Sequence, residues 1–168
     1  MKNMYITTGT LEYLQKLKEN VSNENTLLLE GKDHVMLLHE TNGATVFQEP
    51  RRYEVLDAAG ELGGAFAVLN NIPVTDEGRP LFEYRFSQRT RLIEKEPGFV
   101  AIRVLRPLSN DTYIIMTLWE GEEHFKNWQR SKAYEKAHER RNAANQEEQQ
   151  TIFPRPSYVT TYTVVQQS

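Results

Sequence analysis

Apolar and polar positions follow a regular order in the second half of the chain. Four segments have the apolar runs or the period-two alternation of strands: Ala65–Val74, Phe99–Leu105, Thr112–Leu118 and Tyr158–Val165. A helix is predicted to start within Asp76–Pro80 and to reach about Ile93, because proline is favoured in a first helical turn. A second, amphipathic helix is predicted after Gly121. Residues 64–168 therefore predict the order β-α-β-β-α-β, which is the ferredoxin-like arrangement.

The first half of the chain repeats part of this order. Strands are expected at Met4–Thr7, Thr26–Glu30, His34–Glu40 and Ala44–Gln48, and Arg51–Asp57 is expected to extend the sheet. One helix is predicted after Thr10, which suits a helix N-cap. The glycine-rich stretch of residues 58–64 predicts a linker. We therefore expect a degenerate ferredoxin-like half without a second helix at residues 1–60, and a complete unit at residues 64–168.

Composition narrows the classes of function. Of the 168 residues, 39% are hydrophobic and 26% are charged, as in ordinary globular proteins. The net charge of −3 gives no basic footprint for nucleic acid. The chain has no cysteine, which excludes disulfides, thiolate metal sites and cysteine nucleophiles. No stretch has the pattern of a signal peptide or the ~20 apolar residues of a membrane span. We expect a cytoplasmic protein that binds neither nucleic acid nor membranes.

Candidate chemistry gathers in the helix after Gly121. Trp128 and His138 stand ten residues apart, so one straight helix would separate them by about 15 Å and turn them roughly 80° out of line. Ser131 lies between them, and its hydroxyl favours a break in the helix at that point. A kink there would let both side chains approach one pocket. The residues alone indicate an amphipathic helix with one candidate ligand, since an aromatic on such a helix usually belongs to a core.

A longer pattern gives this helix a resemblance. The motif Phe125-x-x-Trp128-x-x-Ser131-x-x-Tyr134-x-x-Ala137-His138, directly after a strand that ends in Trp119, resembles the IsdG-type heme-degrading monooxygenases. These enzymes belong to the antibiotic biosynthesis monooxygenase (ABM) superfamily. The resemblance covers about residues 64–168, and the additional N-terminal half matches the layout of the longer, HmoB-type members.

The resemblance implies an α+β fold of the dimeric α–β barrel type, in which ferredoxin-like units commonly pair their sheets. The N-terminal half is expected to take the place of the second unit. One chain would then form a pseudo-dimer with one functional site and work as a monomer.

The family also has a functional asparagine near the end of its first strand, followed by Arg-Ile-Pro-Val. This chain has Asn70-Asn71-Ile72-Pro73-Val74. Asn70 fits the family position better, and strand alternation puts it on one face with Phe66, Val68 and Ile72. Asn71 would point to the other face, and it replaces an arginine that is frequent in the family. Which of the two asparagines is functional stays open at this point.

The resemblance implies that heme is both the substrate and the oxygen-activating centre. His138 would bind the heme iron as the axial ligand. Asn70 would donate a hydrogen bond toward dioxygen on the opposite face, and Trp128 would press on the porphyrin and favour a ruffled ring. The reaction would open the ring and release iron. It needs O2 and an external electron donor or reductase, because no Gly-x-Gly-x-x-Gly follows a strand.

Two other functions use the same residues. The first is a cofactor-free ABM-type monooxygenase that acts on a quinol or phenolic substrate, since one fold hosts several chemistries. The second is a heme carrier or sensor without catalysis, which would use His138 and leave Asn70 without a role. Of the remaining candidates, Trp119 is expected in the core, and His34 and His39 are expected at the surface or at a sheet edge.

Overall fold

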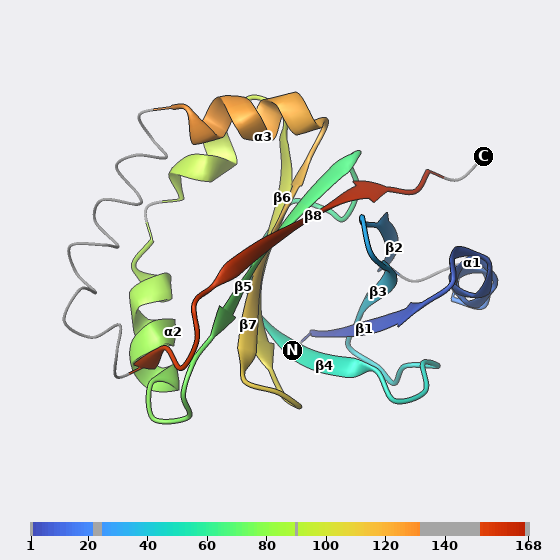
Figure 1. The fold of residues 1–168 in the computed structure, drawn as a ribbon, viewed down its shortest axis with the longest axis horizontal. Helices are drawn as coiled ribbons and strands as arrows, with labels where there is room; N and C mark the ends of the chain where they lie inside the picture. Colours follow the sequence, from blue (N-terminus) through green and yellow to red (C-terminus); the bar gives the residue numbers. More distant parts are fainter. Residues whose placement is uncertain (1, 22–24, 90, 132–151, 167–168) are drawn as a thin grey trace.

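The computed structural model describes residues 2–21, 25–89, 91–131 and 152–166. The N-terminal half contains β1 (Asn3–Gly9), α1 (Leu11–Glu19), β2 (Asn25–Glu30), β3 (Val35–Thr41) and β4 (Arg51–Ala59). The C-terminal half contains β5 (Phe66–Pro73), α2 (Arg79–Ser87), the 3-10 helix η1 (Leu92–Lys95), β6 (Phe99–Pro107), β7 (Thr112–Trp119), α3 (Glu122–Gln129) and β8 (Tyr158–Val164). The strands form a closed barrel with α1 on one side and α2 and α3 on the other (Figure 1).

The strand order shows how the two halves form one barrel. Around the barrel the order is β1-β3-β2-β8-β5-β7-β6-β4, and neighbouring strands are antiparallel. Within each half the fourth strand lies beside the first, the first beside the third, and the third beside the second. This is the ferredoxin-like order, found in both halves. The expected α+β fold, a pseudo-dimer of two ferredoxin-like halves, is confirmed, whereas the domain limits 1–60 and 64–168 stay a prediction.

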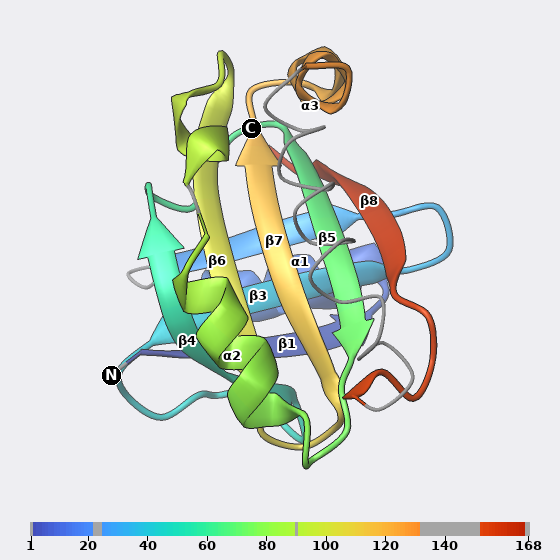
Figure 2. The ribbon, with the colours of Figure 1, turned by 90° about the vertical axis from the view of Figure 1, so that its left-hand side faces the viewer.

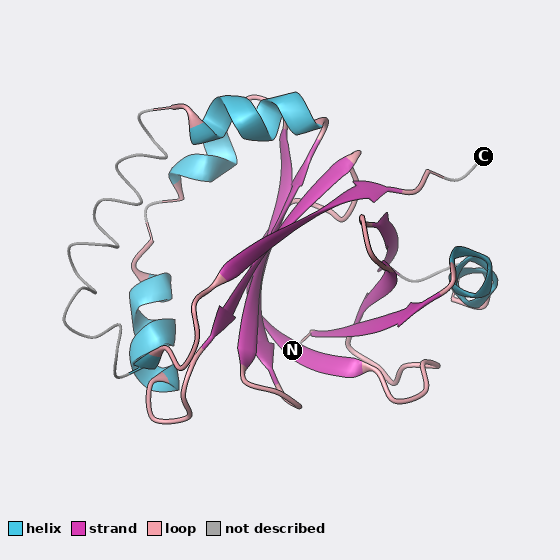
Figure 3. Ribbon diagram, viewed as in Figure 1, coloured by secondary structure: helices cyan, strands magenta, loops and turns pink. Residues whose placement is uncertain are grey.

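Alternation along the strands divides the apolar side chains between the barrel interior and its outer faces. The interior holds residues from both halves, among them Ile6, Leu38, Leu69 and Met116, each almost fully buried. Burying a leucine or isoleucine in this way stabilises the fold by roughly 1.5–3 kcal/mol. The helices stand outside the layer of strands (Figure 3) and cover the outer faces.

One charged pair lies inside this apolar barrel. Arg103 of β6 donates from Nε to the Glu40 carboxylate of β3 at 2.6 Å, and the two side chains are 6% and 1% exposed. Arg103 also donates to the backbone oxygen of Ala59 at 3.2 Å. The pair therefore joins the N-terminal half to the C-terminal half in the barrel interior.

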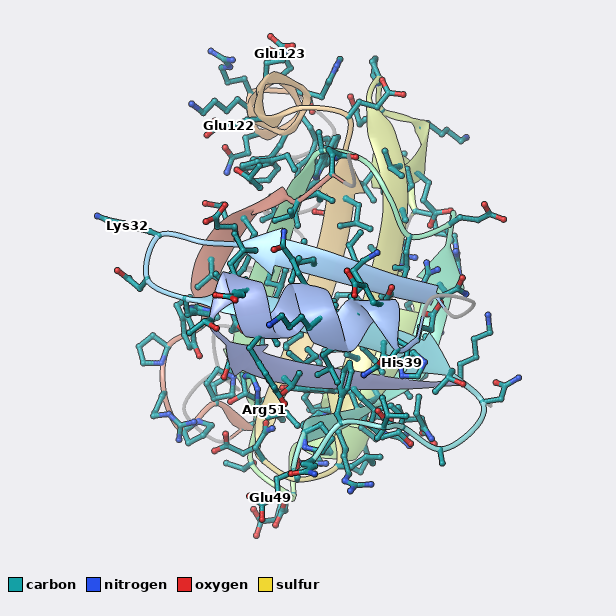
Figure 4. All side chains as sticks on the ribbon, turned by 90° about the vertical axis from the view of Figure 1, so that its right-hand side faces the viewer. Lys32, His39, Glu49, Arg51, Glu122 and Glu123 are labelled. Carbon is teal, nitrogen blue, oxygen red and sulfur yellow. The ribbon has the colours of Figure 1, made fainter. Side chains whose placement is uncertain are left out.

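The outer face of the N-terminal half is filled by its own side chains. Leu14 of α1 packs with Tyr5, Leu28, Leu37 and Phe47 in one buried cluster. His39 lies in the same layer, 2% exposed, with its ring 5.6 Å from that of Phe47. The prediction that His39 lies at the surface is therefore wrong, whereas His34 is exposed as expected. Figure 4 shows this side of the molecule, with α1 in front of the strands.

Two predicted elements differ from the structure. Residues 44–48 form no strand, because both edges of β1 and both edges of β3 are already paired. The helix predicted to reach Ile93 ends at Ser87, and Arg91 then adopts a left-handed backbone with φ 59°. Arg89 and Arg91 both donate to the Asp57 carboxylate of β4, at 2.9 Å each. These long-range ion pairs tie the segment between α2 and η1 to β4, so the helix ends early.

Candidate functional site

The candidate site lies on the outer face of β5, β7 and β6. In Figure 2 this face is turned to the viewer, with α2 lying across it and α3 at one end. Ala67 and Leu69 of β5 belong to the barrel interior, whereas Ile72 belongs to the cluster under α2. Because side chains alternate along a strand, Phe66, Val68 and Asn70 share the outer face with Ile72. The expected orientation of β5 is confirmed.

Asn70 is the polar residue among the outward-facing side chains of β5, since Phe66, Val68 and Ile72 are apolar. It is half-buried, and its neighbours across the strands are Ile115 of β7 and Val159 of β8. Within the described part of the chain, the Asn70 side chain makes no hydrogen bond. An amide with both donor and acceptor atoms left open is suited to bind a ligand, since buried polar groups in proteins are normally paired.

Asn71 is in the opposite situation. It is 7% exposed and points to the other face of β5. Its Nδ2 donates to the Leu69 oxygen at 3.0 Å and to the Tyr158 oxygen at 3.2 Å, and lies 3.2 Å from the Thr160 hydroxyl. These bonds tie β5 to β8. The geometry therefore gives Asn71 a structural part and leaves the Asn70 amide open.

Trp128 lies in α3 at one end of the same face. Its half-buried ring is 6.0 Å from the ring of Trp119 and 6.2 Å from that of Phe125. Trp119 is fully buried, as the sequence predicts for a core residue. The ring of Phe66 is 6.2 Å from the ring of Phe125. Trp128 therefore forms part of an aromatic cluster (Phe66, Phe99, Trp119, Phe125 and Trp128) that seats α3 on the ends of β5, β6 and β7.

The helix ends where the sequence predicts a break. α3 stops at Gln129, and the Ser131 hydroxyl donates to the Trp128 backbone oxygen at 2.7 Å. The serine satisfies one of the carbonyl groups that every helix C-terminus leaves open. His138 lies outside the described residues, so the structure brings Asn70 and Trp128 to one face and gives no position for the imidazole.

The spacing on this face suits a flat ligand. Phe66 and Asn70 are four residues apart on β5, a distance of about 13 Å along the strand. Phe66 contacts α3, and the Asn70 amide lies further along β5. A planar ligand that lies along β5 would therefore meet aromatic rings at one end and an amide at the other.

A second polar network, which the sequence analysis missed, fixes α2 at the other end of this face. Glu83 of α2 accepts hydrogen bonds from Arg106 of β6 and from the hydroxyl of Tyr113. The Arg106 hydrogen bonds hold the pKa of the Glu83 carboxyl below its usual value. Burial, reinforced by the Glu83 carboxylate, raises the pKa of the Tyr113 hydroxyl. No local signal could reveal this network, because its members are 23 and 30 residues apart.

Other features of the described residues give no competing site. Clefts of about 320 and 210 Å³ lie beside β2 and β8 and include neither Asn70 nor Trp128 in their walls. Residues 2–21, 25–89, 91–131 and 152–166 contain no group of three or more His, Asp or Glu side chains suited to a metal ion. No helix among them is long and apolar enough to span a membrane.

A barrel of two ferredoxin-like halves, with one outer face lined by an open amide and an aromatic cluster, defines an α+β protein of the dimeric α–β barrel class. Residues 65–140 match the family model for antibiotic biosynthesis monooxygenase (ABM). A heme-degrading monooxygenase of Listeria monocytogenes is 30% identical over 132 residues, which cover 78% of this chain and 79% of the relative. The chain belongs to the ABM family.

Further similarities extend over most of the chain. The signal transduction protein TRAP of Staphylococcus aureus is 26% identical over 135 residues, or 80% of this chain and 81% of that protein. The solved structure of a major regulator of staphylococcal pathogenesis superposes with a TM-score of 0.85 at 23% identity, covering 98% of this chain and 100% of the other. This last likeness concerns the fold alone.

Proposed function

We propose that this protein is a heme-degrading monooxygenase that opens the porphyrin ring with O2 and an external electron donor and releases iron. The observation that carries the proposal is the amide of Asn70 on the outer face of β5, which has no hydrogen-bond partner among the described residues. On the same face, Trp128 stands in an aromatic cluster at one end. An apolar surface with one open amide matches a flat, largely apolar substrate that needs a polar group directed at one point.

Each side chain has a role in this proposal. Heme, the substrate, supplies the oxygen-activating chemistry when it is bound. His138 would hold the iron through a neutral imidazole nitrogen. Asn70 would donate its amide N–H toward dioxygen and orient it. Trp128 would press on the macrocycle from α3.

The Listeria relative supports this choice within the ABM family. It is a heme-degrading monooxygenase that aligns with more than three quarters of this chain. The filled outer face of the N-terminal half gives a second argument. Among the described residues, the N-terminal half has no helix between β3 and β4 that would correspond to α3, and Phe47 of the connecting loop is buried in the apolar cluster there, so one chain should bind one heme.

A heme titration followed by reduction in air tests the proposal. Hemin is expected to bind at one equivalent with a sharp Soret band. Ascorbate in air, with catalase present to remove free peroxide, should bleach that band, and the same mixture under argon should keep it. A band that survives reduction in air would remove the enzyme claim.

A second candidate function is a heme carrier or sensor without catalysis. The similarity to a signal transduction protein supports this candidate. Replacing Asn70 by Ala separates the two functions. In an oxygenase the variant should bind hemin as the wild type does and lose most of its turnover, whereas a carrier has no turnover to lose.

The cofactor-free monooxygenase is separated from both by His138→Ala. Replacing a residue that hydrogen-bonds a metal ligand typically lowers the metal affinity about 10–100-fold. Removing the ligand His138 itself should therefore lower the hemin affinity by at least that factor. An enzyme that acts directly on a quinol or phenol would keep its activity in this variant.

A further inference from the structure

The two tryptophans of the chain form one unit in the structure. The sequence contains only Trp119 and Trp128. Their ring centroids are 6.0 Å apart, and the ring planes are inclined by 33°. Trp119 is fully buried, and Trp128 is half-buried at the candidate site. A change in how the buried Trp119 ring is held would therefore be passed to the half-buried Trp128 ring through their contact.

Among the described residues, the indole of Trp119 is held by one hydrogen bond and by close packing. Its indole Nε1 donates to the Thr117 hydroxyl of the same strand at 3.0 Å. Phe99 meets the ring edge-on at 5.9 Å and 89°. The Trp119 backbone oxygen accepts from the Ala65 N–H at 2.8 Å. Packing can tolerate a ring that slides or flips, whereas the hydrogen bond selects one ring orientation.

Thr117 lies at the right place to act through Trp119. It is 7% exposed and sits on the outer face of β7, opposite Val68 of β5. It lies between the row of Asn70 and the aromatic cluster. Thr117, Trp119 and Trp128 are thus in contact one after another, from strand β7 to the half-buried ring at the candidate site.

We propose that Thr117 and Trp119 are positioning residues: the buried hydrogen bond between them sets the ring plane of Trp128, and with it the contact of Trp128 with the bound macrocycle. The catalytic part of this inference rests on the proposed heme degradation. The structural part concerns the two tryptophans and stands without a ligand.

The test compares Thr117→Val, which removes the hydroxyl at constant shape, with Thr117→Ser, which keeps it. Thr112→Val is the matched control, because Thr112 is on the same strand and its hydroxyl donates to Asp111 at 2.8 Å, away from the aromatic cluster. The near-ultraviolet circular dichroism of the ligand-free protein reports the Trp119–Trp128 pair. Hemin affinity and the bleaching rate in air are then measured on the same samples.

Thr117→Val should change the tryptophan signal, bind hemin with unchanged affinity, and bleach about tenfold more slowly or worse, since small misplacements cost up to 10²-fold. Thr117→Ser and Thr112→Val should match the wild type in all three. If Thr117→Val does not fold, Trp119→Phe removes the same hydrogen bond and keeps a ring, and Trp128 emission replaces the dichroism.

The outcomes separate this inference from the proposed function. An unchanged tryptophan signal in Thr117→Val overturns the structural part. A changed signal with wild-type bleaching overturns the catalytic part and leaves heme degradation standing. A wild-type protein that binds hemin without bleaching overturns the proposed function and the catalytic part together, whereas the dichroism still decides the structural part.

Discussion

At the scale of single residues, two adjacent asparagines have different environments because they lie on opposite faces of β5. Asn71 is buried and bonded to β8, and Asn70 is half-buried with an open amide. The alternation of the strand is enough to predict this difference from the sequence. The same alternation could not predict the hydrogen bond between Trp119 and Thr117, because side-chain orientation within a face depends on packing.

Alanine at each position should separate stability from function. Asn71→Ala removes the amide and leaves the Tyr158 oxygen without this donor, so the free energy of unfolding should fall by about 1–3 kcal/mol. Asn70→Ala loses no hydrogen bond within the described residues and should stay within about 0.5 kcal/mol of the wild type. Urea unfolding measures both. Equal losses in the two variants would contradict the assignment.

At the scale of elements, the strands could be predicted better than the helix ends. The predicted segments Ala65–Val74 and Tyr158–Val165 match β5 and β8 to within one residue at either end. The strand predicted at residues 44–48 is absent, because the neighbouring strands have no unpaired edge left. Phe47 is instead buried in the cluster with Leu14 of α1. The predicted end of α2 was wrong, because Arg89 and Arg91 after the helix form ion pairs with Asp57, which is more than 30 residues away in the sequence.

The attachment of α2 should depend on pH. Hydrogen bonds from Arg106 lower the pKa of Glu83 in the folded state. The carboxylate therefore stabilises the fold fully at pH values above 4.5, the ordinary pKa of this group in the unfolded chain. That contribution should disappear as the pH falls from there through the lower folded pKa. Glu83→Gln should lose about 1–3 kcal/mol at pH 7 and less in acid.

The matched control is Glu12→Gln on α1, whose pairing with Lys16 at 3.6 Å is almost fully exposed and should matter little. Thermal unfolding between pH 3 and 7 makes the comparison. A constant difference between Glu83→Gln and the wild type across this range would contradict the coupling.

At the scale of the whole molecule, the described residues join the two halves by backbone pairing, by partly exposed ion pairs to β4, and by the buried Glu40–Arg103 pair. The β4–β6 seam is long, running from Tyr53 opposite Pro107 to Ala59 opposite Ile102. Among the described residues the β2–β8 seam is shorter: Leu29 pairs with Val164 and Glu30 with Thr163, and the Val165 N–H donates to the Leu28 oxygen. The sequence predicted the pseudo-dimer through the resemblance, but gave no sign that Glu40 and Arg103, 63 residues apart, meet inside the barrel.

Removing one partner of this pair should be far worse than removing both. Glu40→Met leaves the buried Arg103 without its carboxylate and should cost about 3–5 kcal/mol. The double variant with Arg103→Met should recover most of that loss, because apolar side chains of similar volume replace buried pairs well. A denaturant double-mutant cycle measures the coupling. Additive losses would show that the pair does not join the halves.

The proposed activity of the whole molecule is to convert heme to a ring-opened product and to free the iron. The most direct measurement loads one equivalent of hemin, adds ascorbate and catalase in air, and follows the Soret band together with capture of ferrous iron by a coloured chelator. Heme degradation should give loss of the band with capture of one iron per hemin in air, and neither bleaching nor iron capture under argon. A stable band without captured iron would contradict it.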